Sequence, residues 1–460
     1  MKSSRANIHT RVHKIPTVQY ESQKLTSFAG AVLIQSYWSA IGMKETVRRC
    51  FQHLKSGRIF GLDMVFLQLI VHILLGFRRL RDRDYYCDDP LLCRLLGVSR
   101  LPDVGTLSRT LQTADGQSVE RVRGVLREQS LAVVEREQFA RVTLDFDGSV
   151  LSTKGHAEGT AVGFNPKHRG ARSYYPLFCT VAQTGQFFDV HHRPGNVHDS
   201  NGATAFIDAC LGRVRERAPR SQLESRLDSA FFSEGVLAVL QARGVDFSIS
   251  VPFERFPTLK YLIDSRCRWT AIDDTFAYFE TEWSPKSWDA RHRIILIRKT
   301  ALKQRKGPLQ LDLFEPRDTV YEYKAFVTNK TGSAAAVLEF HHGRGAQEAI
   351  FGEGKQWAAL DYIPCRRLFA NQLYTCAALI AHNTARDMQV HHTPRRHDRN
   401  SPTRQALWDF LSLGTLRRRF FQRAGRLTRP AGHLTLTVSA NDQARNDFAS
   451  YLDSFTKLAA

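Results

Sequence analysis

Hydrophobic residues in the first ~135 positions recur at helical spacing and predict a mainly helical region. The segments "AVLIQSYWSAIGMKETVRRCF" and "MVFLQLIVHILLGF" each have this spacing. The segment "DPLLCRLLGVSRLPDVGTLSRTLQ" predicts two short helices separated by Ser99–Asp103. This pair is either a helix-turn-helix, with Thr106, Ser108 and Arg109 reaching DNA, or a plain helical hairpin within a bundle. The pattern leaves both alternatives open.

The pattern changes from helical to alternating at Arg141. In "RVTLDFDGSVLST", one face of the expected strand is apolar (Val142, Leu144, Phe146) and the other is polar (Thr143, Asp145, Asp147). A hairpin around Thr184-Gly185, a helix, a strand ending at Asp228, a Ser-capped helix and a further strand follow. The order β-β-β-α-β-α-β predicts an α/β fold, in which a mixed sheet is flanked by helices.

The remaining chain divides into parts that differ in their pattern of apolar and polar residues. Residues 253–329 alternate and carry Trp269, Trp283 and Trp288, which predicts a β-rich insertion. A helix over 341–355, an apolar helix, a polar linker and a basic tail come next. We therefore expect five parts: a helical DNA-binding domain (1–135), a first core segment (136–252), the insertion (253–329), a second core segment (330–388), and a basic linker with a C-terminal tail (389–460).

The charge balance indicates a polyanionic partner. The 460 residues contain 65 Lys and Arg against 45 Asp and Glu, a net charge of +20, and such an arginine excess favours nucleic acid. The eight cysteines form no CxxC pair, which excludes the common zinc motifs and indicates reduced thiols in a cytosol. The N-terminus lacks the apolar core of a signal peptide, and the most apolar run is too short to span a bilayer. We expect a cytoplasmic protein without a membrane partner.

Three acids stand where metal chemistry would need them. Asp147 lies on the first strand, Asp228 ends the fourth strand, and Glu348 lies on the helix "HHGRGAQEAIFGEGK". On an ideal helix His341, Arg344, Glu348 and Lys355 fall within about 60° of arc, whereas Glu353 points away. Two acids on one face of a buried strand, Asp145 and Asp147, are costly unless cations neutralise them. Mg²⁺ prefers such oxygen ligands together with phosphate oxygens.

With these motifs the chain resembles the DDE-type transposases of bacterial insertion sequences. The group it resembles has the signature Tyr-x2-Arg-x3-Glu-x6-Lys on the helix of the third acid. Arg344, Glu348 and Lys355 match that spacing, while His341 replaces the tyrosine. The segment "LDFDGS" is similar to the first-acid strand and "SRLDSAFF" to the second-acid motif. The resemblance assigns the acids to Asp147 and Asp228, with Asp145 as the alternative first acid.

The resemblance implies an RNase H-like core with an insertion between the second and third acids. It implies two Mg²⁺ ions, replaceable by Mn²⁺, that are held by Asp147, Asp228 and Glu348, with Asp145 as a further candidate ligand. Arg344 and Lys355 would contact DNA phosphates near the reacting end. Three further basic residues follow the first strand and could line the path of the DNA: Lys154, Lys167 and Arg169.

The activity implied is binding to the inverted repeats of an element, cleavage, and joining of the 3′ ends to target DNA, by a homodimer in the synaptic complex. Two alternatives stay open: a catalytically inactive, transposase-derived DNA-binding protein, and an RNase H-like nuclease without strand transfer. Within that resemblance we also expect the separate helical region 1–135 to recognise the element ends. No residue pattern in the chain predicts the sequence of the terminal repeats, the target site or a hairpin intermediate.

Overall fold

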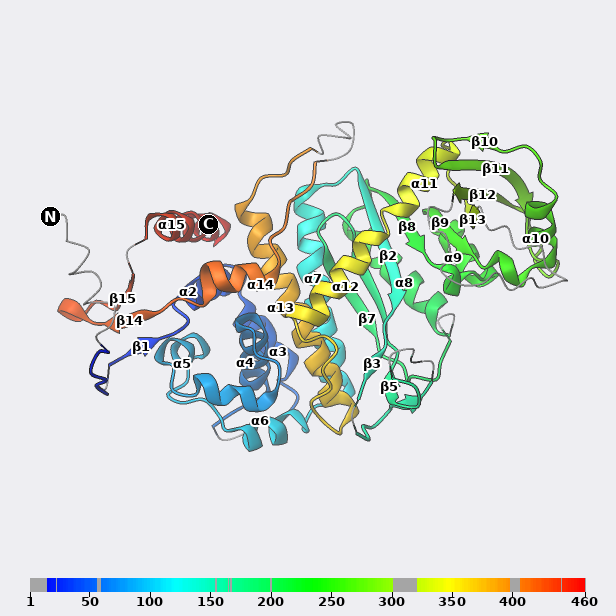
Figure 1. The fold of residues 1–460 in the computed structure, drawn as a ribbon. Helices are drawn as coiled ribbons and strands as arrows, with labels where there is room; N and C mark the ends of the chain where they lie inside the picture. Colours follow the sequence, from blue (N-terminus) through cyan, green and yellow to red (C-terminus); the bar gives the residue numbers. More distant parts are fainter. Residues whose placement is uncertain are drawn as a thin grey trace.

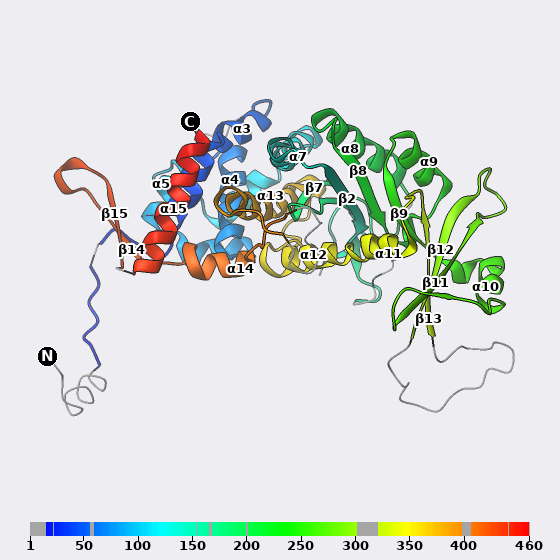
Figure 2. The same cartoon turned by 90° about the horizontal axis from the view of Figure 1, so that it is seen from above.

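The computed structural model describes residues 15–21, 23–55, 59–153, 155–163, 165, 168–198, 201–300, 321–397, 406–439 and 441–459. Its centre is a nine-stranded mixed sheet in the order β10-β11-β12-β13-β9-β8-β2-β6-β7. Helices cover both faces of this sheet, and a helical region lies beside its β7 edge (Figures 1 and 2). The α/β class predicted from the alternating segments is confirmed.

Five strands of the central sheet, with two helices packed on them, form the first expected core segment. β2 pairs antiparallel with β6, β6 with β7, and β2, β8 and β9 run parallel. The β6–β7 turn contains Gly185 at φ 60°, a left-handed conformation that favours glycine. The elements are β2 (Arg141–Gly148), β6 (Leu177–Val181), β7 (Gln186–His191), α8 (Ala203–Arg217), β8 (Gln222–Leu227), α9 (Glu234–Ala242) and β9 (Asp246–Val251). A small second sheet follows β2, in the order β3-β5-β4: β3 (Leu151–Ser152), β4 (Ala161–Val162) and β5 (Arg172–Tyr174).

Both faces of β2 are buried, but by different chemistry. Its apolar side chains join a core with α7 (Gly116–Glu137), α8 and α9. On the polar face Thr143 is 4% and Asp145 0% exposed, and here α11 (Ala334–His342) and α12 (Gly345–Trp357) lie across the sheet (Figure 2). The alternation therefore separates an apolar core on one face of β2 from a buried polar layer on the other. Asp145 and Asp147 belong to the polar layer.

The β-rich insertion continues the central sheet instead of forming a layer of its own. β13 pairs antiparallel with β9, and β12, β11 and β10 extend the sheet outward. The described part of the insertion also contains η3 (Phe253–Arg255) and α10, which the alternating pattern did not predict. Its elements are α10 (Pro257–Asp264), β10 (Thr270–Ala271), β11 (Phe276–Trp283), β12 (His292–Thr300) and β13 (Tyr321–Thr328).

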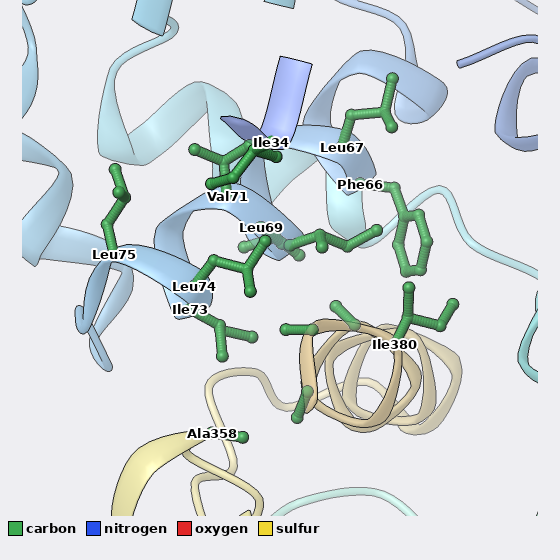
Figure 3. Close-up of a cluster of buried hydrophobic side chains, with 14 of the residues drawn as sticks. Ile34, Phe66, Leu67, Leu69, Val71, Ile73, Leu74, Leu75, Ala358 and Ile380 are labelled. Carbon is green, nitrogen blue, oxygen red and sulfur yellow. The ribbon is translucent and has the colours of Figure 1, made fainter. Parts of the chain in front are cut away.

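The N-terminal region is helical, as its spacing predicts. The first expected helix is divided at Gly42, whose φ of 64° interrupts the helical backbone. The helices are α2 (Ala31–Ala40), α3 (Met43–Cys50), α4 (Leu62–Leu75), η1 (Leu80–Tyr86), α5 (Pro90–Leu96) and α6 (Val104–Leu111). α4 is apolar almost all round, because it packs against the neighbouring helices of this region and against the long helix α13 (Leu368–His392) (Figure 3).

The core of the N-terminal helices is shared with much later parts of the chain. One cluster of buried side chains contains residues from helices α2 through α7 together with residues of α12, α13 and the C-terminal segment. In α13, residues Ala377 to Ala381 are all 0–1% exposed, which places the helix inside the molecule. A fragment of residues 1–135 would expose this apolar face, so the structure argues against end recognition by that fragment alone.

The segment after residue 389, expected as a basic linker and C-terminal tail, contains several helices and strands in its described part. α13 continues to His392, and α15 (Asp442–Ala459) packs on α2, with the rings of Tyr37 and Phe455 5.4 Å apart. The other elements are α14 (Leu413–Leu416), η4 (Arg417–Phe421), β14 (Gly425–Thr428) and β15 (Thr435–Val438); β14 pairs with β1 (Leu25–Thr26). Residues 398–405 of the expected linker lie outside the described residues.

No helix within the described ranges is both long and apolar enough to cross a membrane.

Candidate active site

The site begins with the register of two parallel strands. β2 and β8 pair so that Asp145 lies beside Arg226. Two residues farther along, on the same face, Asp147 reaches the end of β2 and Asp228 follows β8. Because the strands are parallel, their carboxyl ends meet at one edge of the sheet. The structure therefore brings Asp147 and Asp228 together from positions 81 residues apart in the chain, the separation of the Asp145–Arg226 pair.

In each of these two carboxylates, one oxygen accepts a backbone hydrogen bond and the other faces Arg344. Asp147 Oδ1 accepts a hydrogen bond from the backbone N–H of Gly148 (2.8 Å), and Asp228 Oδ1 from that of Ala230 (3.0 Å). The two Oδ2 atoms face one guanidinium nitrogen, Nη2 of Arg344, at 3.1 and 3.5 Å. Arg344 thus bridges two carboxylates that would otherwise repel each other.

Asp145 has a different partner. Both of its oxygens accept from Arg226, at 2.7 and 2.6 Å, and the side chains are 1% and 8% exposed. Burial raises the pKa of Asp145, and the adjacent Arg226 opposes that shift. A two-pronged ion pair of this kind engages both carboxylate oxygens. The contacts of Asp147 described above include no such two-pronged pair, and Asp145 stays the alternative first acid and metal ligand.

Arg226 is a site residue that the sequence analysis missed. It is 7% exposed, and its Nη1 also donates to the backbone oxygen of Phe340 in α11 (3.3 Å). A signal was present: Arg226 precedes Asp228 by two residues, just as Asp145 precedes Asp147. Only the register of β2 and β8 shows that Asp145 and Arg226, the first residues of these two pairs, lie beside each other.

The segment expected as one helix is two helices that meet at Gly343-Arg344. α11 ends at His342, and α12 begins at Gly345. A Cβ at Gly343 would lie 2.0 Å from Nη1 of Arg226, so only glycine permits this close approach. Gln347, 0% exposed, donates from Nε2 to the backbone oxygen of Asp145 (2.9 Å). The junction therefore rests directly on the paired strands and fixes the start of α12 above their ends.

His341 faces the central sheet from α11, as Arg344 does from the junction with α12. Its ring lies between the hydroxyls of Ser248 and Ser250, both at 3.0 Å. Burial, with a contribution from Arg344, lowers its pKa to about 3. The residue at the tyrosine position of the signature is a neutral ring that anchors α11 to β9.

Glu348 and Lys355 lie on α12, two turns apart and about 20° apart in helical projection. Glu348 is exposed in the first turn, one turn after Arg344, and side chains at this spacing are neighbours. Lys355 is partly buried. Within the part of the chain that the structure describes, no three His, Cys, Asp or Glu residues converge as a metal cluster. The structure brings together Asp147, Asp228 and Arg344, and Glu348 follows Arg344 by one turn on α12.

Glu353 points away from this face, as predicted, but it is not a free surface charge. Its carboxylate pairs with Arg386 of α13 and accepts from the backbone N–H of Leu413 at the start of α14 (2.9 Å). Its side chain is 13% exposed. Glu353 therefore ties α12 to two neighbouring helices, and its replacement cannot serve as a neutral comparison for Arg344 or Lys355.

The other basic residues expected along the DNA are only partly placed. Lys154 and Lys167 lie outside the described residues, and Arg169 is exposed on the loop between β4 and β5. The two short helices expected around Ser99–Asp103 are α5 and α6. On α6, Arg109 is exposed, while Thr106 and Ser108 are half-buried.

The donor set at the strand ends fits a hard divalent cation. Two carboxylate oxygens from different strands face one positive group within 3.5 Å, so the position already selects a cation. The ligands are oxygens, which Mg²⁺ prefers. The Nε of Arg344 is buried and has no hydrogen-bond partner within the described part of the chain. One donor of the guanidinium therefore makes no hydrogen bond at this position. Such a side chain can be displaced by a metal ion at a lower cost.

A comparison with protein families covers almost the whole chain. The family model of the transposase DDE domain, group 1, matches residues 10–460. The chain belongs to this family. No curated protein matches it.

Among solved structures, the chain is similar to a piggyBac transposase in a synaptic complex with hairpin DNA, at 12% identity and a TM-score of 0.37, over 77% of this chain and 75% of that one. It is also similar to the Mos1 transposase in a paired-end complex with the left transposon end, at 13% identity and a TM-score of 0.17, over 43% of this chain and 60% of that one.

Proposed function

We propose that this DDE-family protein is the transposase of an insertion sequence, which binds the element ends, cleaves the DNA and joins the 3′ ends to target DNA. The observation that carries the proposal is the pair Asp147 and Asp228, which lie side by side at the ends of parallel strands with one oxygen each directed at the same cation. Membership of the transposase family supports it. The proposal includes a homodimer as the synaptic form.

Asp147, Asp228 and Glu348 are the residues that would hold two Mg²⁺ ions. When bound, such ions supply positive charge to the attacking and leaving oxygens of a phosphoryl transfer. The chain prepares this position in two ways. The backbone N–H groups of Gly148 and Ala230 orient the aspartates, and Gln347 holds the start of the Glu348 helix against β2.

Arg344 and Lys355 are the residues that we assign to the DNA phosphates. Lys355 lies on the side of α12 that carries Glu348, and Arg344 immediately precedes that helix. Both are cations that can contact phosphate oxygens. Arg344 has a second role in the protein without DNA, because it neutralises Asp147 and Asp228 there. A phosphate near the strand ends would offer its guanidinium an alternative partner.

The test is a joining assay with a labelled duplex taken from the inverted repeats that flank the reading frame, together with a supercoiled target plasmid. We expect nicked or cleaved ends first and then joined products. Cleavage without joined products would support the nuclease alternative and contradict strand transfer. Binding without cleavage under every metal condition would indicate the inactive DNA-binding alternative.

We expect end cleavage in Mg²⁺ or Mn²⁺ but not in Ca²⁺. Mg²⁺ demands near-octahedral oxygen ligands, whereas Ca²⁺ takes six to eight ligands in a flexible arrangement, so it should support DNA binding without turnover. Gel assays of one labelled end, with each metal and with excess EDTA, measure this. Cleavage that persists in excess EDTA would contradict metal dependence.

Arg344→Ala should lower end cleavage more than tenfold and at the same time strengthen Mn²⁺ binding to the DNA-free protein several-fold. The guanidinium competes with an ion for the same two Oδ2 atoms, so its removal vacates their shared position. Titration calorimetry measures the metal affinity. Arg344→Lys, which keeps the charge, is the matched comparison. Unchanged or weaker Mn²⁺ binding by Arg344→Ala would contradict the competition.

Lys355→Ala should also lower cleavage more than tenfold. Each lost phosphate contact should reduce the log–log salt dependence of DNA binding by about one unit. Fluorescence anisotropy over a salt series measures that slope. An unchanged slope would remove Lys355 from the set of phosphate contacts.

A further inference from the structure

A basic groove lies outside the strand ends, at the opposite end of the molecule from the insertion. It is a cavity of about 850 Å³ lined by Lys24, Arg94, Arg100 and Arg429 among others, with Asp88 as its one acidic side chain. The four cations, here called the basic groove residues, come from separate segments. Lys24 precedes β1, Arg94 lies on α5, Arg100 follows α5, and Arg429 follows β14 (Figure 1). The groove therefore joins the N-terminal and C-terminal parts of the chain.

Hydrogen bonds fix the relative positions of these segments. The backbone N–H of Leu427 in β14 donates to the oxygen of Lys24 (2.9 Å). The hydroxyl of Thr26 in β1 donates to the carboxylate of Asp89, which caps the N-terminus of α5. The strand pair and the capped helix thus form one unit. The four cations are held around the same cavity by the fold itself.

The basic groove residues lack partners that other arginines of the chain possess. All four are exposed, and none has a side-chain hydrogen bond or ion pair with a described residue. By contrast, Arg217 pairs with Glu128 and Glu135. A helix C-terminus favours a cation, which accounts for Arg94 in the last turn of α5 but not for Lys24 or Arg429. Gathering four cations about one acid costs repulsion unless a polyanion binds there.

We propose that the basic groove binds the phosphate backbone of double-stranded DNA, so that DNA is held jointly by the N-terminal helices and the C-terminal β14 segment. The inference rests on the proposed function and adds a DNA surface remote from the acids. A cavity of this volume exceeds a single phosphate, and cations on separate elements suit successive phosphates of a duplex. The groove also adjoins the turn between α5 and α6, so a duplex seated there would lie beside that helix pair.

The test is the salt dependence of binding to a fluorescent duplex of about 30 random base pairs, measured by anisotropy with the full chain in EDTA. Arg94→Ala/Arg429→Ala removes one cation from each part of the groove. We expect an affinity loss of about tenfold or more and a log–log slope shallower by about 1.8, since each phosphate contact contributes roughly 0.9. The matched control is Arg220→Ala/Arg291→Ala, two exposed arginines outside the groove, which should keep the wild-type slope.

A second measurement uses the unmodified protein. Cys87 and Cys93 line the groove, whereas Cys267 is exposed after α10 at the other end of the molecule. Bound duplex should slow alkylation of Cys87 and Cys93 relative to Cys267, followed by mass spectrometry. Equal rates with and without DNA at both groove cysteines would overturn the inference.

The two proposals fail in different ways. If the wild-type chain binds the duplex and the groove variant binds with the same affinity and slope, the groove inference is wrong and the proposed function stands. If the wild-type chain binds no duplex, the proposed function itself is contradicted. Protection of Cys267 equal to that of the groove cysteines would indicate unspecific coating and would also overturn the inference.

Discussion

Asp147→Ala, Asp228→Ala and Glu348→Ala should each abolish cleavage of an end-containing duplex and leave binding to that duplex largely intact. Asp147 and Asp228 face a cation position at the strand ends, and Glu348 follows Arg344 by one turn on α12. These carboxylates would stabilise the reaction through ions and repel phosphates, so their loss should not weaken DNA binding. Gel assays of cleavage, with anisotropy for binding, measure the two effects separately.

The matched control for the acids is Asp246→Ala, a partly exposed carboxylate on β9 that forms ion pairs with Arg141 and Lys330. It should retain cleavage. Any of the three acid variants that still cleaves at the wild-type rate would be removed from the site. A variant that loses binding together with cleavage would indicate a role in DNA contact or in folding.

Asp145→Ala should lower the free energy of unfolding by about 3–5 kcal/mol, because it leaves Arg226 as an uncompensated buried charge. The paired side chains are 1% and 8% exposed, and both carboxylate oxygens are used. Asp147→Ala, at 20% exposure and at the end of its strand, should cost only about 1 kcal/mol. Denaturant unfolding monitored by circular dichroism measures both variants.

The double replacement Asp145→Leu/Arg226→Met separates loss of charge from loss of packing. Apolar residues of similar volume often replace a buried ion pair at little cost, so the double variant should be much more stable than Asp145→Ala. If Asp145→Ala folds with wild-type stability yet fails to cleave, Asp145 and not Asp147 is the first acid. That result would reverse the assignment of Asp147 as the first acid.

Local patterns in the sequence predicted much of the fold correctly. The alternation over Arg141–Gly148 predicted β2, the turn at Thr184-Gly185 predicted the β6–β7 hairpin, and Ser233 predicted the start of α9. These features depend on the side-chain period and on capping within a few residues. For the same reason they indicate which face of an element is buried but not which element covers it.

Several features of the site depended on contacts between distant residues. The helical projection assumed one helix over 341–355, whereas the segment is divided into α11 and α12 at Gly343-Arg344, where Gly343 packs on Arg226. Spacing placed Glu353 away from the site but could not show its pairing with Arg386. A partner across the fold leaves no periodic signal in the residues next to it.

The sequence by itself determined the type and order of the core elements, the apolar and polar faces of β2, and the candidate acids, because these follow from periodicity and residue chemistry along the chain. The tertiary structure alone decided that Asp145 pairs with Arg226 while Asp147 and Asp228 share Arg344. It also decided that the insertion extends the central sheet and that α15 packs on α2. The physical reason is that strand register and helix packing are set by burial and charge pairing between segments far apart in sequence, where a shift of one residue would turn each acid to the opposite face.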